Sequence, residues 1–151
     1  MKPFWDARVA DWVAYQIWGD GPAFRECQAL GVAHKGQLVA GLVFHDWNPR
    51  AQTIEISAAA VDRRWASRTV INEALTYAFD RVGSQAVMAR HAENNAPARK
   101  LWEALGAQEV IVPRMYGQTE NGAVAVLTKE AWGTSRFRRV QNGQKQRANA
   151  A

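Results

Sequence analysis

The chain has 151 residues, of which 48% are hydrophobic and 22% charged, and its net charge is +5, as in an ordinary soluble domain. This composition excludes an intrinsically disordered chain, a collagen-like repeat and a small disulfide scaffold, because the only cysteine is Cys27. No apolar run approaches the roughly 18–20 residues that span a bilayer, and the first residues lack a signal-peptide pattern, so we expect a cytoplasmic protein.

The N-terminal half predicts one helix followed by three strands. Apolar residues recur at every fourth position between Asp6 and Trp18, which indicates a helix capped by Asp6 and ended by Gly19. A tight turn joins the first two strands, and the third follows a second turn. The predicted strands are Ala29–His34, Gln37–Asp46 and Thr53–Val61.

The C-terminal half predicts two helices that alternate with strands. An apolar stripe predicts the longest helix over Ser67–Val82. Asn95 is placed to cap a second helix, which ends at Gly106. The remaining predicted strands are Gln85–His91, Gln108–Tyr116 and Ala123–Thr128. The order of elements predicts an α/β fold with one central sheet of about six strands.

The excess positive charge lies at the C-terminal end. Residues 1–132 contain 14 basic and 14 acidic side chains, whereas residues 133–151 contain basic side chains and no acid. Because residues 141–151 are also polar and aperiodic, we predict a folded domain over 1–132 and a disordered basic tail over 133–151. Such a tail either solubilises the chain or contacts nucleic acid.

A compact basic turn, Asp62-Arg63-Arg64-Trp65-Ala66-Ser67-Arg68, leads from a predicted strand directly into the longest predicted helix. A turn of this kind aims backbone N–H groups and the positive end of a helix dipole at one point, which suits a phosphate or diphosphate. Its three arginines add positive charge. The alternative interpretation is a solvated charge cluster, since basic residues before helices are common.

The segment from Asn95 to Ala107 resembles the Asn-x-x-Ala-x-x-x-Tyr-x-x-x-Gly-Phe motif of the GNAT family of acyl-CoA-dependent N-acyltransferases. Asn95, Ala98 and Gly106 occupy its fixed positions, while Trp102 stands at the tyrosine position. The basic turn is similar to the family's Arg/Gln-x-x-Gly-x-Gly/Ala loop, with Ala66 and Arg68 at its glycine positions. It is also similar to a Trp-x-Ser/Thr-Arg loop of acetyltransferase-like proteins of bacteria and their phages.

The resemblance implies the GNAT fold, a mixed and mostly antiparallel sheet with flanking helices and a V-shaped gap. The strand Thr53–Val61 would splay from Gln85–His91, and the pantetheine arm of acetyl-CoA would lie between them. The diphosphate would bind the amides of the basic turn, and a backbone N–H near Ala59–Val61 would polarise the acyl carbonyl. The implied cofactor-binding residues are Ala59, Ala60, Val61, Arg63, Arg64, Trp65, Ala66, Ser67, Arg68, Asn95, Ala98 and Arg99.

The candidate catalytic residues are Glu55 and Tyr116. Glu55 lies on the strand where the family often places a carboxylate, and it would act as the base that keeps the acceptor amine neutral. An exposed strand carboxylate without a catalytic role is an equal alternative, and His45 and Asp46 are second choices for the base. The indole at Trp102 cannot act as a general acid, so Tyr116 is the candidate to protonate the leaving thiolate.

The sequence therefore predicts an N-acetyltransferase that transfers an acetyl group from acetyl-CoA to a primary amine by direct attack. One alternative is a GNAT-fold binding module without turnover, and another is a nucleic-acid-directed protein that uses the basic tail. The family often dimerises, so a homodimer is also expected. The histidines and Cys27 show no metal-ligand spacing, and we expect no metal.

Overall fold

The computed structural model describes residues 1–20 and 23–138, and its centre is a seven-stranded sheet in the order β1-β2-β3-β4-β5-β7-β6. Every neighbouring pair of strands is antiparallel except β4 and β5, which are parallel. The predicted mixed, mostly antiparallel sheet is thus confirmed. The strands are β1 (Lys2–Trp5), β2 (Cys27–His34), β3 (Gln37–Asn48), β4 (Thr53–Ala60), β5 (Ala86–Ala92), β6 (Gln108–Gly117) and β7 (Glu120–Thr128).

The seventh strand, β1, is the one that the sequence did not predict. It has four residues, pairs with β2 from Lys2 opposite Ala33 to Trp5 opposite Leu30, and contains Pro3. Proline is tolerated there because β1 lies at the edge of the sheet. Four residues with a proline carry too little periodic pattern to indicate a strand.

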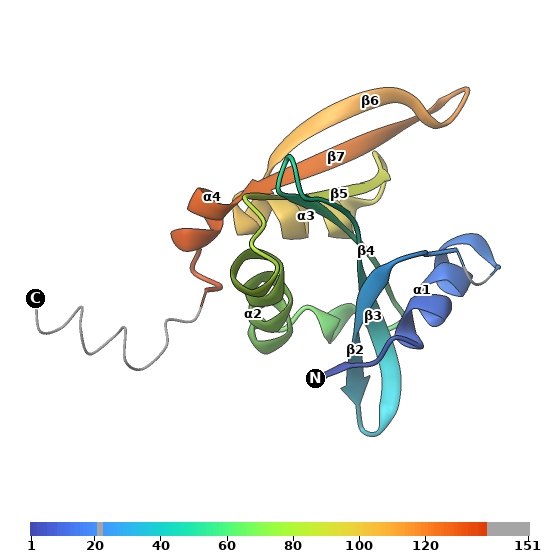
Figure 1. Cartoon of the computed structure of the whole chain (residues 1–151). Helices are drawn as coiled ribbons and strands as arrows, with labels where there is room; N and C mark the ends of the chain where they lie inside the picture. Colours follow the sequence, from blue (N-terminus) through green and yellow to red (C-terminus); the bar gives the residue numbers. More distant parts are fainter. Residues whose placement is uncertain (21–22, 139–151) are drawn as a thin grey trace, which may run out of the picture.

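Helices cover both faces of the sheet, namely α1 (Val9–Trp18), α2 (Arg68–Thr76), α3 (Ala96–Leu105) and α4 (Lys129–Gly133). Figure 1 shows α1 on one side of β2–β4 and α2 on the other. On the α1 side, Val9 and Val13 pack with Val43, and the helix approaches the sheet over Gly41. A Cβ atom at Gly41 would lie 2.6 Å from methyl groups of Val9 and Val13. On the α2 side, the core contains Ile56, Leu75 and Phe79, among others.

The helix ends follow the capping residues closely, with one correction. Asp6 is not the N-cap of α1, because its carboxylate accepts hydrogen bonds from the amide and guanidinium of Arg8 and the helix starts only at Val9. Asn95 caps α3 as predicted, and Gly106 ends α3 in the left-handed conformation. Ser67, predicted as the first residue of the long helix, is the N-cap of α2. The long helix continues from α2 as a π-helical turn, η2 (Tyr77–Arg81).

The described chain extends beyond the predicted domain boundary at residue 132. The short helix α4 follows β7 directly, Trp132 is buried, and Phe137 packs against the main core. Residues 139–151 of the predicted tail lie outside the described residues. Among the described helices, none combines the length and the apolar character needed to cross a membrane.

The sheet divides in the middle, between β4 and β5. Strand β4 pairs with β3 over nearly its whole length, from Thr53 to Ala60, but with β5 only over Thr53–Glu55. Beyond Glu55 the two parallel strands diverge, and β5 continues in partnership with β7 (Figure 1). The predicted V-shaped gap is therefore present in the sheet.

Candidate functional site

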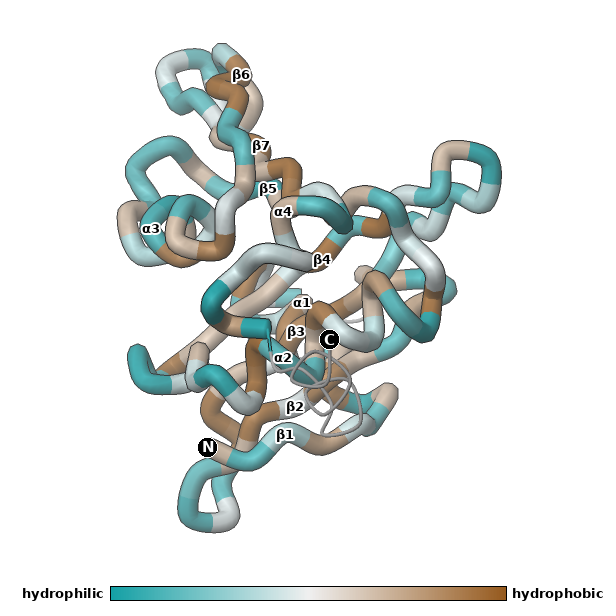
Figure 2. Tube along the Cα trace, turned by 90° about the vertical axis from the view of Figure 1, so that its left-hand side faces the viewer, coloured by the Kyte–Doolittle hydropathy of each residue, from teal (hydrophilic) through white to brown (hydrophobic). Residues whose placement is uncertain are grey.

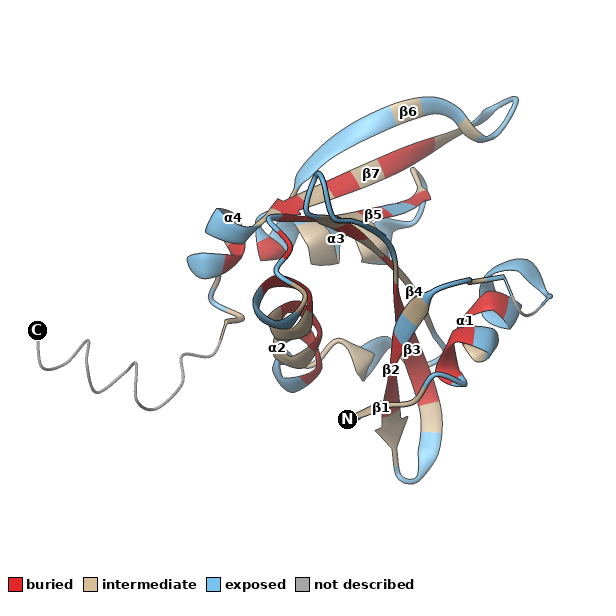
Figure 3. Cartoon of the chain, viewed as in Figure 1, coloured by how far each residue is buried: buried red, intermediate tan, exposed pale blue. Residues whose placement is uncertain are grey.

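A cleft of about 840 Å³ opens where β4 and β5 diverge. Its lining comes from the second half of β4, the turn that follows, α2, the end of β5 and α3. Apolar side chains of the two core strands form its floor, and Figure 2 shows hydrophobic strand segments beside hydrophilic turns. Val61, at the rim of the cleft, is 64% exposed. Figure 3 shows that most residues of α3 are exposed or half-buried. An extended, partly apolar ligand would fit this cleft.

The edge of β4 that faces the cleft presents unpaired peptide groups. The Val61 amide donates to the Val39 carbonyl at 2.8 Å, and hydrogen-bonded positions alternate along an antiparallel pair. Ala59 therefore also directs its N–H to β3, while Ala58 and Ala60 direct theirs toward β5. No strand pairs with β4 there, and among the described residues these two amides have no hydrogen-bond partner. Of the predicted amides near Ala59–Val61, those of Ala59 and Val61 are therefore bonded to β3, and that of Ala60 is free to polarise a ligand carbonyl.

The turn between β4 and α2 has some amides that are free and some that are already bonded. The amides of Arg64 and Trp65 bind Asp62, and that of Ser67 binds the Trp65 carbonyl. Within the described part of the chain, no hydrogen bond uses the amides of Arg63, Ala66 and Arg68. A short 3₁₀ helix, η1 (Arg63–Trp65), fixes this pattern. With the Asp62 amide, which is also unbonded within the described chain, the turn offers four free donors beside the start of α2.

The three arginines of this turn are not equivalent. Arg64 binds the Asp62 carboxylate at 2.8 Å, and the hydrogen bonds from its guanidinium and amide hold the pKa of Asp62 well below its usual range. Arg63 and Arg68 are exposed and form no ion pair with a described residue. Positive charge available to an anion therefore resides on Arg63 and Arg68.

The predicted residues on α3 separate onto two sides of that helix. Asn95 and Ala98 line the cleft, and the Asn95 side chain accepts from the Ala98 amide at 3.3 Å. Arg99 lines a different hollow of about 480 Å³ on the other side of α3, where it binds Glu109 at 2.7 Å. It also donates to the Glu93 carbonyl at 2.9 Å. The structure thus brings Asn95 and Ala98 to the cleft and ties Arg99 to β6.

A buried histidine that the sequence analysis did not single out lies in the cleft. His91, at the end of β5, is 9% exposed, and its Nε2 atom has no hydrogen-bond partner. Burial lowers the pKa of His91, while Glu109 raises it and Arg99 lowers it further. A buried nitrogen without a hydrogen-bond partner is costly unless a ligand or water satisfies it.

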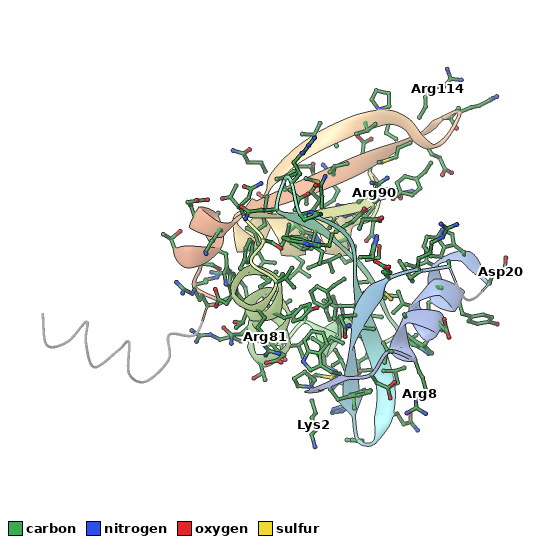
Figure 4. The ribbon with its side chains drawn as sticks, in the orientation of Figure 1. Lys2, Arg8, Asp20, Arg81, Arg90 and Arg114 are labelled. Carbon is green, nitrogen blue, oxygen red and sulfur yellow. The ribbon has the colours of Figure 1, made fainter. Side chains whose placement is uncertain are left out.

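On the α1 side of the gap, the two predicted catalytic residues lie close to one arginine. The Glu55 carboxylate accepts from Arg90 at 2.5 Å and 3.3 Å, and Glu55 is 13% exposed in its side chain. Tyr116, on β6, is 44% exposed; partial burial raises its pKa, the charge of Arg90 lowers it and that of Glu55 raises it. Figure 4 shows Arg90 beside β5, on the side that faces β4 and α1.

A second polar group adjoins Glu55 on the same face. His45 lies opposite Glu55 in the β3–β4 register, and its ring binds Asp46 through Nδ1 at 2.6 Å. Its Nε2 atom binds the Ser57 hydroxyl at 2.8 Å. One potential metal-ligand atom from each of His45, Asp46 and Glu55 lies within 4.8 Å of the other two. However, His45 is hydrogen-bonded to Ser57, and Glu55 is hydrogen-bonded to Arg90.

Ser57, Arg90 and His91 are the residues that sequence reasoning missed. Ser57 follows Glu55 by two positions, so strand alternation alone puts both on one face. Arg90 required knowledge of the parallel pairing of β4 with β5. His91 had no usable signal, because a single histidine in a short strand is usually structural.

Comparison with known proteins adds one family match and several similar structures. The model of the family described as "Acetyltransferase (GNAT) family" matches residues 3–107. No curated protein matches the chain in sequence.

The similar structures share the fold at low sequence identity. A mutant of the spermidine N-acetyltransferase SpeG from Vibrio cholerae has a TM-score of 0.71 at 14% identity, covering 89% of this chain and 98% of that one. Mycobacterium smegmatis RimJ in complex with CoA-disulfide has a TM-score of 0.62 at 17% identity, covering 74% of this chain and 57% of that one. A probable acetyltransferase has a TM-score of 0.60 at 19% identity, and the matched parts are 71% of this chain and 64% of that one.

The buried imidazole makes a prediction about acid stability. Because the pKa of His91 is lowered in the folded chain, the unfolded chain binds the proton more readily. The free energy of unfolding should therefore fall as the pH decreases from about 7 to about 5. In His91→Leu this decrease should be smaller, while stability near neutral pH is retained. Urea unfolding of both proteins across this range measures the difference, and equal pH slopes would contradict the burial argument.

Proposed function

The chain belongs to the acetyltransferase (GNAT) family, and on that premise we propose that it transfers an acetyl group from acetyl-CoA to a primary amine. The observation that carries the proposal is the open edge of β4 beside the basic turn. The amine would attack the thioester directly, from the α1 side of the sheet. Acetyl-CoA supplies the activated acyl group, and the residues of this chain bind it, orient it and move the proton.

The cleft has the donors that a thioester cofactor requires. The peptide groups of Ala58 and Ala60 are free to pair with the amides of a pantetheine arm, as a neighbouring strand would. At the end of β4, Arg63 and Arg68 and the free amides of the turn suit a diphosphate. Asn95 and the unpaired Nε2 of His91 add polar groups to the lining of the cleft.

Glu55 is the proposed base for the acceptor amine. Arg90 occupies one lone-pair direction on each carboxylate oxygen, and a carboxylate has about four such directions in all. Glu55 therefore keeps the capacity to accept a proton from an incoming ammonium group, while Arg90 fixes its position. The remaining turn arginine, Arg64, serves to hold the turn through Asp62.

Tyr116 is the proposed acid for the leaving thiolate. Trp102 lines the cleft and packs against the core, so its indole contributes shape and no transferable proton. The Tyr116 hydroxyl is protonated at neutral pH, because the ordinary pKa of tyrosine is about 10 and burial raises that of Tyr116. A phenol in that state is able to donate a proton to sulfur.

Charge reversal at the turn tests the cofactor assignment. In Arg68→Glu, the affinity for acetyl-CoA measured by calorimetry should fall about tenfold or more, because a cationic partner of the diphosphate becomes a repelling anion. Arg50→Glu is the matched control, because Arg50 precedes β4 whereas the turn follows it. The eight residues of β4 span roughly 25 Å, a distance over which the charge of Arg50 is screened. Equal affinity in Arg68→Glu and in the wild-type protein would remove the turn from the site.

Neutralising the carboxylate tests the base. In Glu55→Gln, the turnover number for primary amines should fall at least about 100-fold, with acetyl-CoA affinity unchanged. Glu109→Gln is the matched control, because Glu109 is also paired with an arginine but lies outside the cleft. Steady-state rates over a panel of primary amines give the comparison. A Glu55→Gln enzyme that turns over at the wild-type rate would rule out Glu55 as base.

A further inference from the structure

Three side chains near the gap form a hydrogen-bonded series that the transfer mechanism above does not use. The Ser57 hydroxyl lies 2.8 Å from His45 Nε2, and His45 Nδ1 lies 2.6 Å from an Asp46 carboxylate oxygen. A neutral imidazole with its proton on Nδ1 satisfies both contacts: it donates to Asp46 and accepts from Ser57. A hydroxyl, a base and an orienting carboxylate in this order are the elements of an activated nucleophile.

The backbone holds this series in place. Asp46 has a φ of 54°, in the left-handed region, where the register between β3 and β4 becomes irregular. At this irregularity, the carboxylate of Asp46 contacts the ring of the preceding residue, His45. On the other side the Phe24 ring lies 5.0 Å from the His45 ring, between centroids. The His45 side chain is only 12% exposed, whereas that of Asp46 is 76% exposed.

Ser57 is also adjacent to the open edge of β4. Its side chain lies on the α1 face of β4, opposite the side chains of Ile56 and Ala58, which line the cleft. The Ala58 amide, directly after Ser57, points toward β5 and has no partner among the described residues. An acyl carbonyl that accepts from the Ala58 amide in the gap would have the Ser57 hydroxyl on the α1 side of the same strand, one residue away.

We propose that Ser57 is a nucleophile with His45 as its base, and that it gives the chain a second activity, hydrolysis of thioesters and activated esters when no amine is bound. Ser57 Oγ forms a bond to the acyl carbon while its proton passes to His45 Nε2. The carbon–sulfur bond breaks, and the thiolate takes that proton and leaves as a thiol. Water then attacks the acyl-Ser57 ester, His45 accepts a proton from the water, the ester bond breaks, and Ser57 regains the proton as the carboxylic acid leaves.

The thioester part of this activity rests on the proposed function, because the same cleft would bind acetyl-CoA. The ester part does not, since p-nitrophenyl acetate carries no CoA and needs only the nucleophile. The two substrates therefore separate a failure of the cofactor assignment from a failure of the nucleophile.

The test measures acyl-enzyme and ester hydrolysis in one set of variants. Wild-type protein is incubated with acetyl-CoA or p-nitrophenyl acetate without amine, quenched in acid and mapped by peptide mass spectrometry. Hydrolysis of p-nitrophenyl acetate is followed in parallel. Ser57→Ala and His45→Gln should lose the acetyl label at Ser57 and at least about 100-fold in hydrolysis rate. Thermal unfolding establishes that both variants are folded.

Cys27→Ala is the matched control for a competing nucleophile. Cys27 lies opposite His45 in the β2–β3 register, and burial raises the pKa of its thiol. The Cys27→Ala variant should keep the label and the hydrolysis rate. If the acetyl label is found on Cys27 and is lost in Cys27→Ala, the nucleophile proposal is overturned. Hydrolysis that persists in folded Ser57→Ala would also overturn it.

The positioning role of Asp46 has its own readout. Asp46→Asn retains a residue type that adopts the left-handed conformation, but it removes the charge beside His45. The variant should lower kcat for p-nitrophenyl acetate about tenfold or more with KM unchanged. An unchanged kcat would overturn the role of Asp46.

Two further outcomes keep the proposals apart. Acetyl-CoA binding and amine acetylation without any acyl-Ser57 would overturn the nucleophile and leave the proposed function standing. Ser57-dependent ester hydrolysis without acetyl-CoA binding would support the nucleophile and contradict the proposed function.

Discussion

The structure depends on the unequal pairing of one strand. Strand β4 is bonded to β3 along nearly its whole length but to β5 only over Thr53–Glu55. The second edge of β4 therefore presents unpaired peptide groups inside the sheet, where an extended ligand could hydrogen-bond to them as a neighbouring strand would. The free amides of Ala58 and Ala60 follow from this divergence, and the basic turn and α3 line the cleft that it opens.

The two faces of β4 then serve different tasks. Ile56 faces the core formed with α2, on the side where the cleft opens. Glu55 and Ser57 face the α1 side, where Arg90 and His45 hold them. In the proposed function, strand alternation thus separates a side for the acyl donor from a side for the proposed base, with the peptide groups of β4 between them. The polar residues of the second side are mutually bonded, so their positions are fixed before any ligand arrives.

Much of this arrangement could be predicted from sequence, and the exceptions have physical causes. Ser67, Asn95 and Gly106 mark helix ends because capping is local, and the alternation of Ile54 and Glu55 defines the strand that carries the site. The short strand β1 was not predicted, because four residues are too few to show an alternating pattern. Asp6 was wrongly predicted as a helix cap, because a carboxylate can also accept hydrogen bonds within a turn, here from Arg8. Pairings between distant segments, such as Glu55 with Arg90 or Arg99 with Glu109, required the register of the strands.

The central claim concerns the open edge of β4, and amide hydrogen exchange measured by NMR tests it directly. Without ligand, the amides of Ala58 and Ala60 should exchange quickly, whereas those of Ala59 and Val61, bonded to β3, should be protected. Saturating CoA should slow exchange at Ala58 and Ala60 and leave Ala59 and Val61 unchanged. Protection of Ala58 and Ala60 in the free protein, or exchange there that CoA does not alter, would contradict the account.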